Sequence, residues 1–346
     1  MPTYITARQF MELKQALPVI DVRSPGEFEF GHVPQAVNIP IFDDRERALV
    51  GTRFKKSGRD FAIELGLELV GPKLSGFVKQ AKKIAPQKKV IVHCWRGGMR
   101  SASMGWLFET AGFEVLLLQG GYKEYRRYNR GQFSTAAHLL ILGGYTGSGK
   151  TDILKELKKK GQQVIDLEGL AHHKGSAFGA IGQEPQPTNE QFENNLTGEW
   201  HFLDKSQPIW LEDESITMGK NGIPDTLFNA MRAAPVIRVD IPREVRAKRL
   251  VQEYACFGTE LLAGSIVRIE SKLGGLRTKE AMDALQLGDF EKVAHITLEY
   301  YDKAYLNGLG KRDPRTIRSI SIEGDDPAKT ADALIEFIQK SEYELI

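Results

Sequence analysis

Short apolar runs alternate with longer amphipathic stretches along most of the chain. In the first 130 residues, apolar runs at Val19–Val22, Lys89–His93 and Glu114–Leu118 predict buried strands, and a helical pattern covers Ser101–Thr110. Alternation of strands and helices is typical of parallel sheets that carry helices on both faces. We therefore expect an α/β fold built on a parallel sheet in this part of the chain.

A second series of the same kind begins near residue 138. Its predicted strands are Leu139–Leu142, Gln163–Ile165, Pro208–Leu211, Pro235–Val239 and Ile317–Ile322, and its main predicted helices are Thr151–Lys160, Arg243–Tyr254 and Pro327–Lys340. Glycine and polar residues between the two series predict a linker. We expect one domain at residues 1–130, a linker at 131–137, and a second α/β domain with C-terminal helical elements at 138–346.

The bulk composition suits two globular domains and excludes few functions. The chain has 346 residues, 41% of them hydrophobic and 27% charged, and its net charge of +2 neither requires nor excludes a nucleic-acid partner. Its two cysteines, Cys94 and Cys256, form neither a disulfide framework nor a close-spaced metal motif, so we expect no dedicated transition-metal site. The start of the chain resembles no signal peptide, and no apolar run approaches membrane-spanning length. We expect a cytoplasmic protein without membrane contact.

The segment HCWRGGMRS, residues 93–101, follows a predicted strand and precedes a predicted helix. Backbone N–H groups and the dipole at a helix N-terminus favour the anionic form of a thiol placed there. Cys94 is therefore a candidate nucleophile, and Arg96 and Arg100 would favour an anionic substrate or intermediate. The simpler alternative is a buried structural cysteine beside two surface arginines.

The segment GYTGSGKT, residues 144–151, matches the phosphate-binding pattern G-x-x-x-x-G-K-[ST] between a predicted strand and a predicted helix. The candidate phosphate-binding residues are Gly144, Gly147, Ser148, Gly149, Lys150 and Thr151. Lys150 would neutralise phosphate charge and is also a candidate catalytic residue, and the Thr151 hydroxyl could ligate magnesium. The pattern predicts a phosphate or diphosphate site without specifying a nucleoside triphosphate.

Acidic residues follow two of the predicted strands in this domain. Glu212 and Asp213 end one apolar run, and Asp166 and Glu168 follow another, so each is a candidate magnesium or substrate contact. Ser176 joins them because it lies in a long, polar, glycine-rich loop, and such loops often carry function. The alternative is that these strands simply end in solvated charges.

Three segments carry a resemblance to rhodanese domains across residues 4–128. They are Asp21–Phe28, Gly31–Pro40 and Leu118–Tyr122. This resemblance implies that Asp21 and Arg23 are structural and that Cys94 carries sulfur or selenium. Arg100 stands six residues after Cys94, one more than is usual in sulfurtransferases of this fold. The longer loop resembles that of rhodanese-related dual-specificity phosphatases, which holds a tetrahedral phosphate, and selenophosphate is also a tetrahedral anion.

A rhodanese-like domain followed by a P-loop NTPase-like α/β domain resembles the tRNA 2-selenouridine synthase family over nearly the whole chain. Cys94–Ser101, Leu167–Gly179 and Glu212–Ser215 carry the resemblance. It implies a transferase that uses selenophosphate to replace sulfur by selenium at C2 of wobble 2-thiouridine in tRNA. It also implies geranyl diphosphate as a co-substrate that gives an S-geranylated intermediate, with magnesium at the P-loop and a selenophosphate-supplying enzyme as a partner. Cys94 could carry selenium or take part in removal of the geranyl-thiol, and both roles stay open.

Two basic stretches are candidate tRNA contacts. Arg126, Arg127 and Arg130 alternate with tyrosines, a mixture suited to phosphates and unpaired bases. Arg243, Arg246 and Arg249 recur every three residues, which places them along one flank of a helix, where they could close over a phosphate or hold tRNA backbone. The alternative for both stretches is a solvated helix face.

Two other functions compete with selenium transfer. One is a rhodanese-type sulfurtransferase or phosphatase fused to an ATP-dependent small-molecule kinase. The other is a non-enzymatic tRNA-binding or nucleotide-sensing protein with an inactive rhodanese-like domain. The presence of Cys94, Lys150 and Thr151 argues against the non-enzymatic hypothesis, because inactive copies typically lose such residues.

Overall fold

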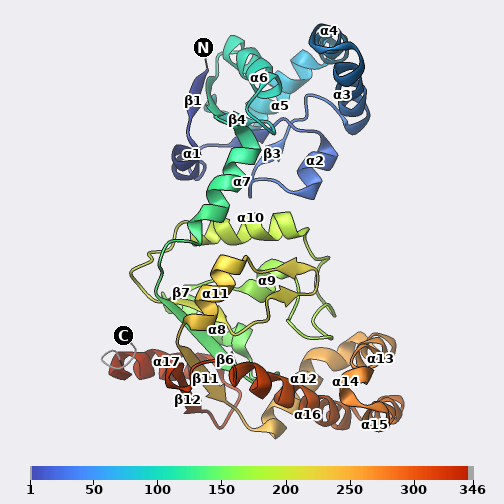
Figure 1. Cartoon of the computed structure of the whole chain (residues 1–346), viewed down its shortest axis with the longest axis vertical. Helices are drawn as coiled ribbons and strands as arrows, with labels where there is room; N and C mark the ends of the chain where they lie inside the picture. Colours follow the sequence, from blue (N-terminus) through green and yellow to red (C-terminus); the bar gives the residue numbers. More distant parts are fainter. Residues whose placement is uncertain (1, 342–346) are drawn as a thin grey trace. The chain divides into compact units, whose positions relative to one another are not determined.

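The computed structural model describes residues 2–341, which form two compact units (Figure 1). The N-terminal unit comprises the chain up to Gln132 together with Glu193–His201, and the P-loop unit comprises Phe133–Phe192 and the chain from Phe202 onward. This division differs from the expected one in two places. Helix α7 (Gly121–Gln132) continues into the expected linker. The segment Glu193–His201 belongs to the first unit although it lies much later in the sequence.

The N-terminal unit contains a five-stranded parallel sheet with the strand order β1-β5-β4-β2-β3. Its strands are β1 (Thr3–Ile5), β2 (Val19–Asp21), β3 (Val37–Asn38), β4 (Lys89–His93) and β5 (Glu114–Leu118). Its other helices are α1 (Ala7–Leu13), α2 (Pro25–Phe30), α3 (Asp44–Ser57), α4 (Arg59–Val70), α5 (Leu74–Ile84) and α6 (Met99–Thr110), with a 3-10 turn at Gly71–Lys73. Helix α10 (Asn189–Trp200) contributes its later residues.

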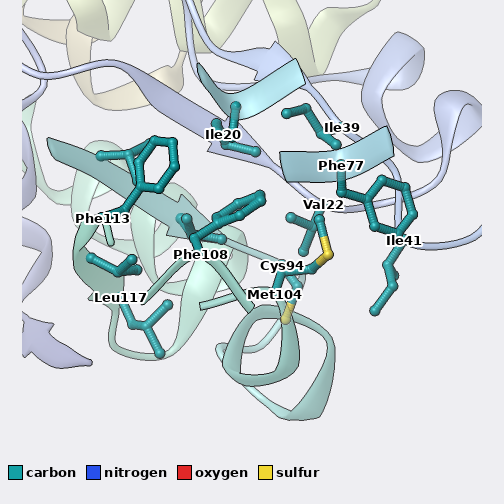
Figure 2. Close-up of a cluster of buried hydrophobic side chains, with 14 of the residues drawn as sticks. Ile20, Val22, Ile39, Ile41, Phe77, Cys94, Met104, Phe108, Phe113 and Leu117 are labelled. Atoms are coloured by element: carbon teal, nitrogen blue, oxygen red, sulfur yellow. The ribbon is translucent and has the colours of Figure 1, made fainter. Parts of the chain in front are cut away.

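Alternate residues of the central strands face two separate cores. Val90 and Val92 of β4 join one core with residues of α5 and α6, whereas Ile91 joins another with residues of α1 and α7. Figure 2 shows the first core, which includes the side chains of Cys94 and Met104. Burial of the strands on both faces explains why they appear in the sequence as continuous apolar runs.

A buried ion pair lies directly after β2. Arg23 donates hydrogen bonds to both carboxylate oxygens of Asp21 and to the carbonyl of Gly31 (2.7 Å), and its guanidinium lies 3.8 Å from the ring centroid of Tyr122. The Asn194 amide, from α10, donates to the Tyr122 hydroxyl at 2.6 Å. A charge pair is tolerated in an apolar interior when its remaining polar groups are satisfied in this way. Asp21 and Arg23 therefore organise the fold, as the rhodanese resemblance implies.

The P-loop unit contains a second five-stranded parallel sheet, with the order β12-β11-β6-β8-β7. Its strands are β6 (Leu139–Gly144), β7 (Gln163–Val164), β8 (Ile209–Glu212), β11 (Val236–Asp240) and β12 (Ile317–Ser321), and β9 (Thr217–Met218) pairs separately with β10 (Asn221–Gly222). Five of its helices are α8 (Lys150–Lys159), α11 (Asp225–Ala233), α12 (Arg243–Tyr254), α16 (Phe290–Leu309) and α17 (Pro327–Ser341). The others are α9 (Leu167–Ala171), α13 (Thr259–Arg268), α14 (Glu270–Leu273) and α15 (Gly275–Gln286), with 3-10 turns at Ala255–Phe257 and Pro314–Thr316.

Helices of this unit contribute to separate cores. Apolar residues of α8 and α17 form one core with strands β6 and β11. Helices α13 to α16 form a further core of their own, which includes Leu262, Ile266 and Val293. These helices precede the last strand, so the expected C-terminal helical elements are largely an insertion between β11 and β12. Among residues 2–341, no helix has the length and apolarity required to cross a membrane.

Two adjacent glycines join the last strand of the N-terminal unit to α7. Gly121 has φ 61°, and a Cβ added to it would collide with the carbonyl oxygen of Cys94. The close approach lets the N–H of Tyr122 donate to that carbonyl at 2.8 Å. The backbone around Cys94 is therefore fixed by a contact that only glycine permits at this position.

Replacing Gly121 by alanine is expected to destabilise the N-terminal unit by at least about 2 kcal/mol, because the new methyl group meets backbone at a left-handed φ. Gly131→Ala in the same helix is the control, since a Cβ added there would have no atom within 4 Å. The control should be neutral or stabilising by up to about 1 kcal/mol. Thermal and urea unfolding followed by circular dichroism would measure both changes. Equal effects of the two substitutions would contradict the prediction.

Candidate functional site

The cysteine loop, defined here as residues 94–98, connects β4 to the first turn of α6 as the sequence predicts. The Cys94 side chain is only 3% exposed, and its Sγ lies 3.2 Å from the Ser101 hydroxyl. That hydroxyl donates to the carbonyl of Gly98 at 3.0 Å. The thiol thus sits between the apolar core and the N-terminal turn of a helix, where Ser101 is its polar neighbour. The surrounding residues therefore shield the thiol from solvent.

The two arginines of this loop region differ in their surroundings. Arg96 is exposed, whereas Arg100 donates to a carboxylate oxygen of Glu27 at 2.7 Å. Burial of Glu27 acts to raise its pKa, but the hydrogen bond and charge of Arg100 outweigh burial and hold the pKa below its ordinary value. The charge of Arg100 is therefore compensated by Glu27, and Arg96 is the cation available to an incoming anion.

The P-loop follows the central strand β6 and closes onto the N-terminus of α8, the geometry that favours phosphate binding. Gly147 and Gly149 have φ of 79° and 71°, so the loop depends on glycine at both positions. The Lys150 ammonium donates to the Gly144 carbonyl at 3.1 Å, and the buried Ser148 hydroxyl has no hydrogen-bond partner among the described residues. A bound phosphate would satisfy that hydroxyl and draw the lysine toward it.

Side chains from later helices hold the P-loop in place. The Arg246 guanidinium is 3% exposed, donates to the Thr146 carbonyl at 3.0 Å, and forms two hydrogen bonds to Asp302 at 2.9 and 3.0 Å. The Tyr305 hydroxyl accepts a hydrogen bond from the Gly144 N–H at 2.9 Å. Arg246 therefore positions the P-loop and is withdrawn as a tRNA contact, because its guanidinium is buried and fully engaged.

The other two arginines of α12 behave differently. Arg249 pairs with Asp152 and Asp325, and its guanidinium would lie 2.9 Å from a Cβ added to Gly149. It lines the phosphate end of the cavity described below, which favours a phosphate contact over a tRNA contact. Arg243, whose side chain is 40% exposed, pairs with Asp302 at 3.1 Å.

The first basic stretch is also divided by burial. Arg126 is 7% exposed and bonds to Asn194 (2.9 Å) and Glu193 (2.5 Å), so it is a structural residue of the N-terminal unit. Arg127 and Arg130 have side chains that are 79% and 66% exposed, and they pair with Glu124 and Glu193, respectively. The expectation of a tRNA contact is therefore withdrawn for Arg126, and it remains a prediction for the two exposed arginines.

The expected carboxylates occupy different positions around the P-loop. Thr151 donates to Glu168 at 2.6 Å, Asp166 caps α9, and Asp213 pairs with Arg312 at 2.6 Å. The fully buried Glu212 accepts from the Leu167 N–H at 3.1 Å. Burial raises its pKa well above the ordinary value, and the charges of Asp166 and Glu168 add to the rise. Thr151 and Glu168 are therefore the pair best placed to share a cation.

Within the described part of the chain, no group of three or more histidine, cysteine or acidic residues is arranged to hold a metal by itself. Magnesium in phosphate sites usually takes one or two protein ligands and completes its shell with phosphate oxygens and water. The hydroxyl of Thr151 and the carboxylate of Glu168 fit that requirement.

A cavity of about 970 Å³ opens from the P-loop, and its two ends differ in chemistry. Lys150 and Arg249 line the phosphate end, where the Arg249 guanidinium lies against Gly149, and Lys174 lines the cavity beside Tyr254. Apolar residues of the helical insertion and its neighbours line the other part, namely Phe178, Tyr254, Leu262, Phe290 and Val293, and Leu250 and Ala294 add apolar lining, with Leu250 next to Gly147. Ser176 also lines the cavity, whereas Glu212 and Asp166 do not. The cavity therefore suits an amphiphilic ligand with an anionic head and an apolar body.

Glu214 is a site residue that the sequence analysis did not single out. It lines the cavity beside Lys150 and Glu168. Burial raises the pKa of Glu214 to about 8, and the neighbouring Glu168 adds to the rise. In the sequence it stands three residues after the predicted strand Pro208–Leu211, within the segment Glu212–Ser215 that carries the family resemblance.

We predict that metal-free binding of inorganic diphosphate weakens above pH 8, because Glu214 is neutral below its raised pKa and repels the anion once ionised. Glu214→Gln should remove most of this loss, which we expect to be about tenfold for one adjacent charge. Dissociation constants measured with a chelator at several pH values would test it. The ligand's own ionisation affects both proteins equally, so parallel pH profiles would contradict the prediction.

Both units match known families. Residues 6–128 match the rhodanese-like domain, and residues 137–326 match the family described as tRNA 2-selenouridine synthase AAA domain. Among solved structures, this chain is similar to the N-terminal domain of a Clostridium difficile 630 protein named as ATP/GTP binding (36% identity, TM-score 0.35, covering 36% of this chain and 98% of that one). A rhodanese-related protein from Thermoplasma volcanium shares 22% identity at a TM-score of 0.24 and covers 36% of this chain and 92% of that one.

Curated relatives extend the similarity over nearly the whole chain. A tRNA 2-selenouridine synthase from Bdellovibrio bacteriovorus is 39% identical over 86% of this chain and 90% of its own length. Synthases of the same name from Aeromonas salmonicida and Shewanella oneidensis are each 36% identical, over 87% and 91% of this chain and 90% and 92% of their own lengths. The expected fold, a rhodanese domain followed by a P-loop domain, is confirmed by the family matches and the two parallel sheets. The chain belongs to the tRNA 2-selenouridine synthase family.

Proposed function

We propose that this protein is a tRNA-modifying transferase that replaces sulfur by selenium at C2 of wobble 2-thiouridine, through an S-geranylated intermediate made from geranyl diphosphate. The observation that carries the proposal is the cavity of about 970 Å³, which joins a P-loop to an apolar wall. A diphosphate would occupy the P-loop end and a hydrocarbon chain the apolar end. The family membership supports the selenation of tRNA.

The first step would be alkylation of the thiouridine sulfur. The sulfur attacks C1 of geranyl diphosphate, the C–O bond breaks, diphosphate leaves, and the base loses its N3 proton. Charge develops on the leaving oxygen, so cationic groups at the phosphate end stabilise the transition state. Lys150 and Arg249 are the cations that line this part of the cavity. The apolar wall binds the geranyl chain and excludes water from the allylic carbon.

Magnesium would be held by Thr151, Glu168 and the phosphate oxygens. When bound, it would neutralise charge on the diphosphate. Glu168 already accepts a hydrogen bond from Thr151, so these two ligands are oriented toward one point beside the P-loop.

The second step would replace the geranylated sulfur by selenium from selenophosphate. Selenium attacks C2, the C2–S bond breaks, and geranyl-thiol leaves, while water cleaves the Se–P bond to release phosphate. A thioether sulfur leaves more readily than the sulfur of an anionic thiouridine. Cys94 could assist departure of the geranyl-thiol. Its other role, carrying selenium as a perselenide, would require a two-electron oxidant in addition, because selenophosphate supplies selenium at the selenide level. The exposed Arg96 beside Cys94 would attract the selenophosphate anion.

The two ends of the cavity can be tested separately by calorimetry with inorganic diphosphate, geranyl diphosphate and ATP. Lys150→Ala should weaken the binding of both diphosphates by about tenfold to a hundredfold, because it removes a charged hydrogen bond. Phe178→Ala should weaken the binding of geranyl diphosphate by about tenfold and leave the affinity for inorganic diphosphate unchanged, because it removes apolar contact area only. Lys159→Ala, an exposed position on the same helix, is the control. Preferential binding of ATP, insensitive to Phe178→Ala, would favour the kinase alternative.

Nucleoside mass spectrometry of 2-thiouridine tRNA tests the whole reaction, with geranyl diphosphate and selenophosphate supplied separately and together. Cys94→Ser should still form the geranylated nucleoside and fail to form the selenated one, because the proposed role of Cys94 lies in the second step. The exposed Cys256 provides a matched control, and Cys256→Ser should complete both steps. Loss of both steps in Cys94→Ser would place the cysteine in the first reaction instead.

A further inference from the structure

Helices α3 and α4 form a pair joined at Gly58 that contributes almost nothing to the core of the N-terminal unit. Helix α3 buries none of its side chains, and α4 buries only Ala62. The pair, called here the basic hairpin (Asp44–Val70), appears in Figure 1 as two adjacent helices. Val50, Leu69 and Val70 pack against the core, and most of the other side chains of the pair are exposed.

Unpaired cations gather on the basic hairpin. Exposed cationic side chains are those of Arg45, Arg47, Arg53, Lys55, Lys56 and Arg59, and among the described residues no carboxylate pairs with Arg45, Arg53, Lys55 or Lys56. The exposed acids of α4, namely Asp60, Glu64 and Glu68, follow these cations in the sequence. The acids at the start of α3 are occupied elsewhere, since Asp44 accepts from the Gly26 N–H at 3.0 Å and Glu46 pairs with Lys73. A hollow of about 450 Å³ between the helices is lined by Arg45, Arg53 and Lys56. No carboxylate of the described residues lines this hollow, so its three cations form a local positive patch that can attract phosphate groups of a polyanion.

Two aromatic side chains are exposed on the same two helices. Phe54 on α3 is 57% exposed and Phe61 on α4 is 56% exposed. Unpaired bases stack on such rings while neighbouring cations hold the phosphates. This combination favours single-stranded or looped RNA over an acidic protein, which has carboxylates but no bases.

The basic hairpin borders the cysteine loop. The Arg59 guanidinium contacts the sulfur of Met99, the first residue of α6, at 3.9 Å. Arg47 of α3 and Arg100 of α6 share the carboxylate of Glu27, at 3.4 and 2.7 Å. RNA bound on the basic hairpin would therefore lie beside the N-terminus of the helix that follows Cys94.

We propose that the basic hairpin is a tRNA-binding surface, on which cations hold the phosphates and Phe54 and Phe61 stack on unpaired bases, so that the wobble nucleotide reaches the cysteine loop. This inference rests on tRNA being the substrate in the proposed function. It assigns tRNA binding to a surface distinct from the basic stretches that the sequence analysis selected.

Fluorescence anisotropy with a labelled, unmodified full-length tRNA transcript tests the surface without requiring turnover. The triple substitution Arg53→Ala, Lys55→Ala and Lys56→Ala should weaken binding by about tenfold or more near physiological salt. It should also reduce the slope of log affinity against log salt by about 2, as loss of three phosphate contacts requires. The matched control neutralises Lys79, Lys82 and Lys83, three exposed lysines of α5 in the same unit, and should bind like the wild type.

A second pair of variants tests stacking. Phe54→Ala with Phe61→Ala should weaken tRNA binding by about tenfold with an unchanged salt slope, because no charge is removed. Leu67→Ala, at a 67% exposed position of the same hairpin, should have no effect. Unchanged tRNA affinity in the triple variant would overturn the inference and leave an acidic protein as the occupant. Equal losses of tRNA affinity in the triple variant and in its α5 control would also overturn the inference, because binding would then reflect a general attraction of tRNA to positive charge.

The same proteins separate this inference from the proposed function. A wild type that binds the transcript through the hairpin but modifies no 2-thiouridine tRNA would contradict the proposed function alone. Full modification at wild-type KM by the triple variant would contradict the hairpin inference alone.

Discussion

Parallel strands that are buried on both faces confine the polar chemistry of this chain to one edge of each sheet. In the N-terminal unit, alternate residues of β4 and β5 enter two apolar cores, and the residues of β6 in the P-loop unit are likewise all buried. Polar groups on such strands would be desolvated, so the loops that follow the strands carry them instead. The cysteine loop and the P-loop are two such loops, and each precedes a helix whose N-terminus favours anions.

Long-range contacts give these two loops their shape. The Gly121 turn brings the backbone of α7 against the carbonyl of Cys94, and the buried pair of Asp21 and Arg23 lies next to it, with Arg23 against the ring of Tyr122. In the P-loop unit, Arg246 links the Thr146 carbonyl to Asp302 of α16. Buried charged groups help to hold each loop, and they are tolerated in the interior because each is paired with an opposite charge. The geometry of each loop is therefore sensitive to substitution of partners that are far away in the sequence.

The apolar end of the P-loop cavity comes from an insertion that phosphate binding by itself does not require. Helices α13 to α16 form their own core, and side chains such as Leu262 and Val293 contribute both to that core and to the cavity wall. One hydrophobic cluster thereby stabilises the insertion and lines the binding site. A ligand with a hydrocarbon body gains affinity from this wall in proportion to the apolar area it buries, which gives the site a basis for discriminating between a prenyl diphosphate and a simple anion.

The sequence by itself determined the features that neighbouring residues encode: the strand–helix alternation, the loop around Cys94, the P-loop, and the extent of helix α12. Hydrophobic periodicity and glycine-rich turns are local signals, so a single chain reveals them. Only the tertiary structure decided which charges are available. Arg126 and Arg246 resemble their exposed neighbours in sequence, yet Glu193 and Asp302, distant along the chain, pair with them and neutralise them. For the same reason, the sequence does not reveal the raised pKa of Glu214 or the lack, among the described residues, of carboxylate partners for most of the cations on α3. The free energy of a charge depends on partners that folding brings together.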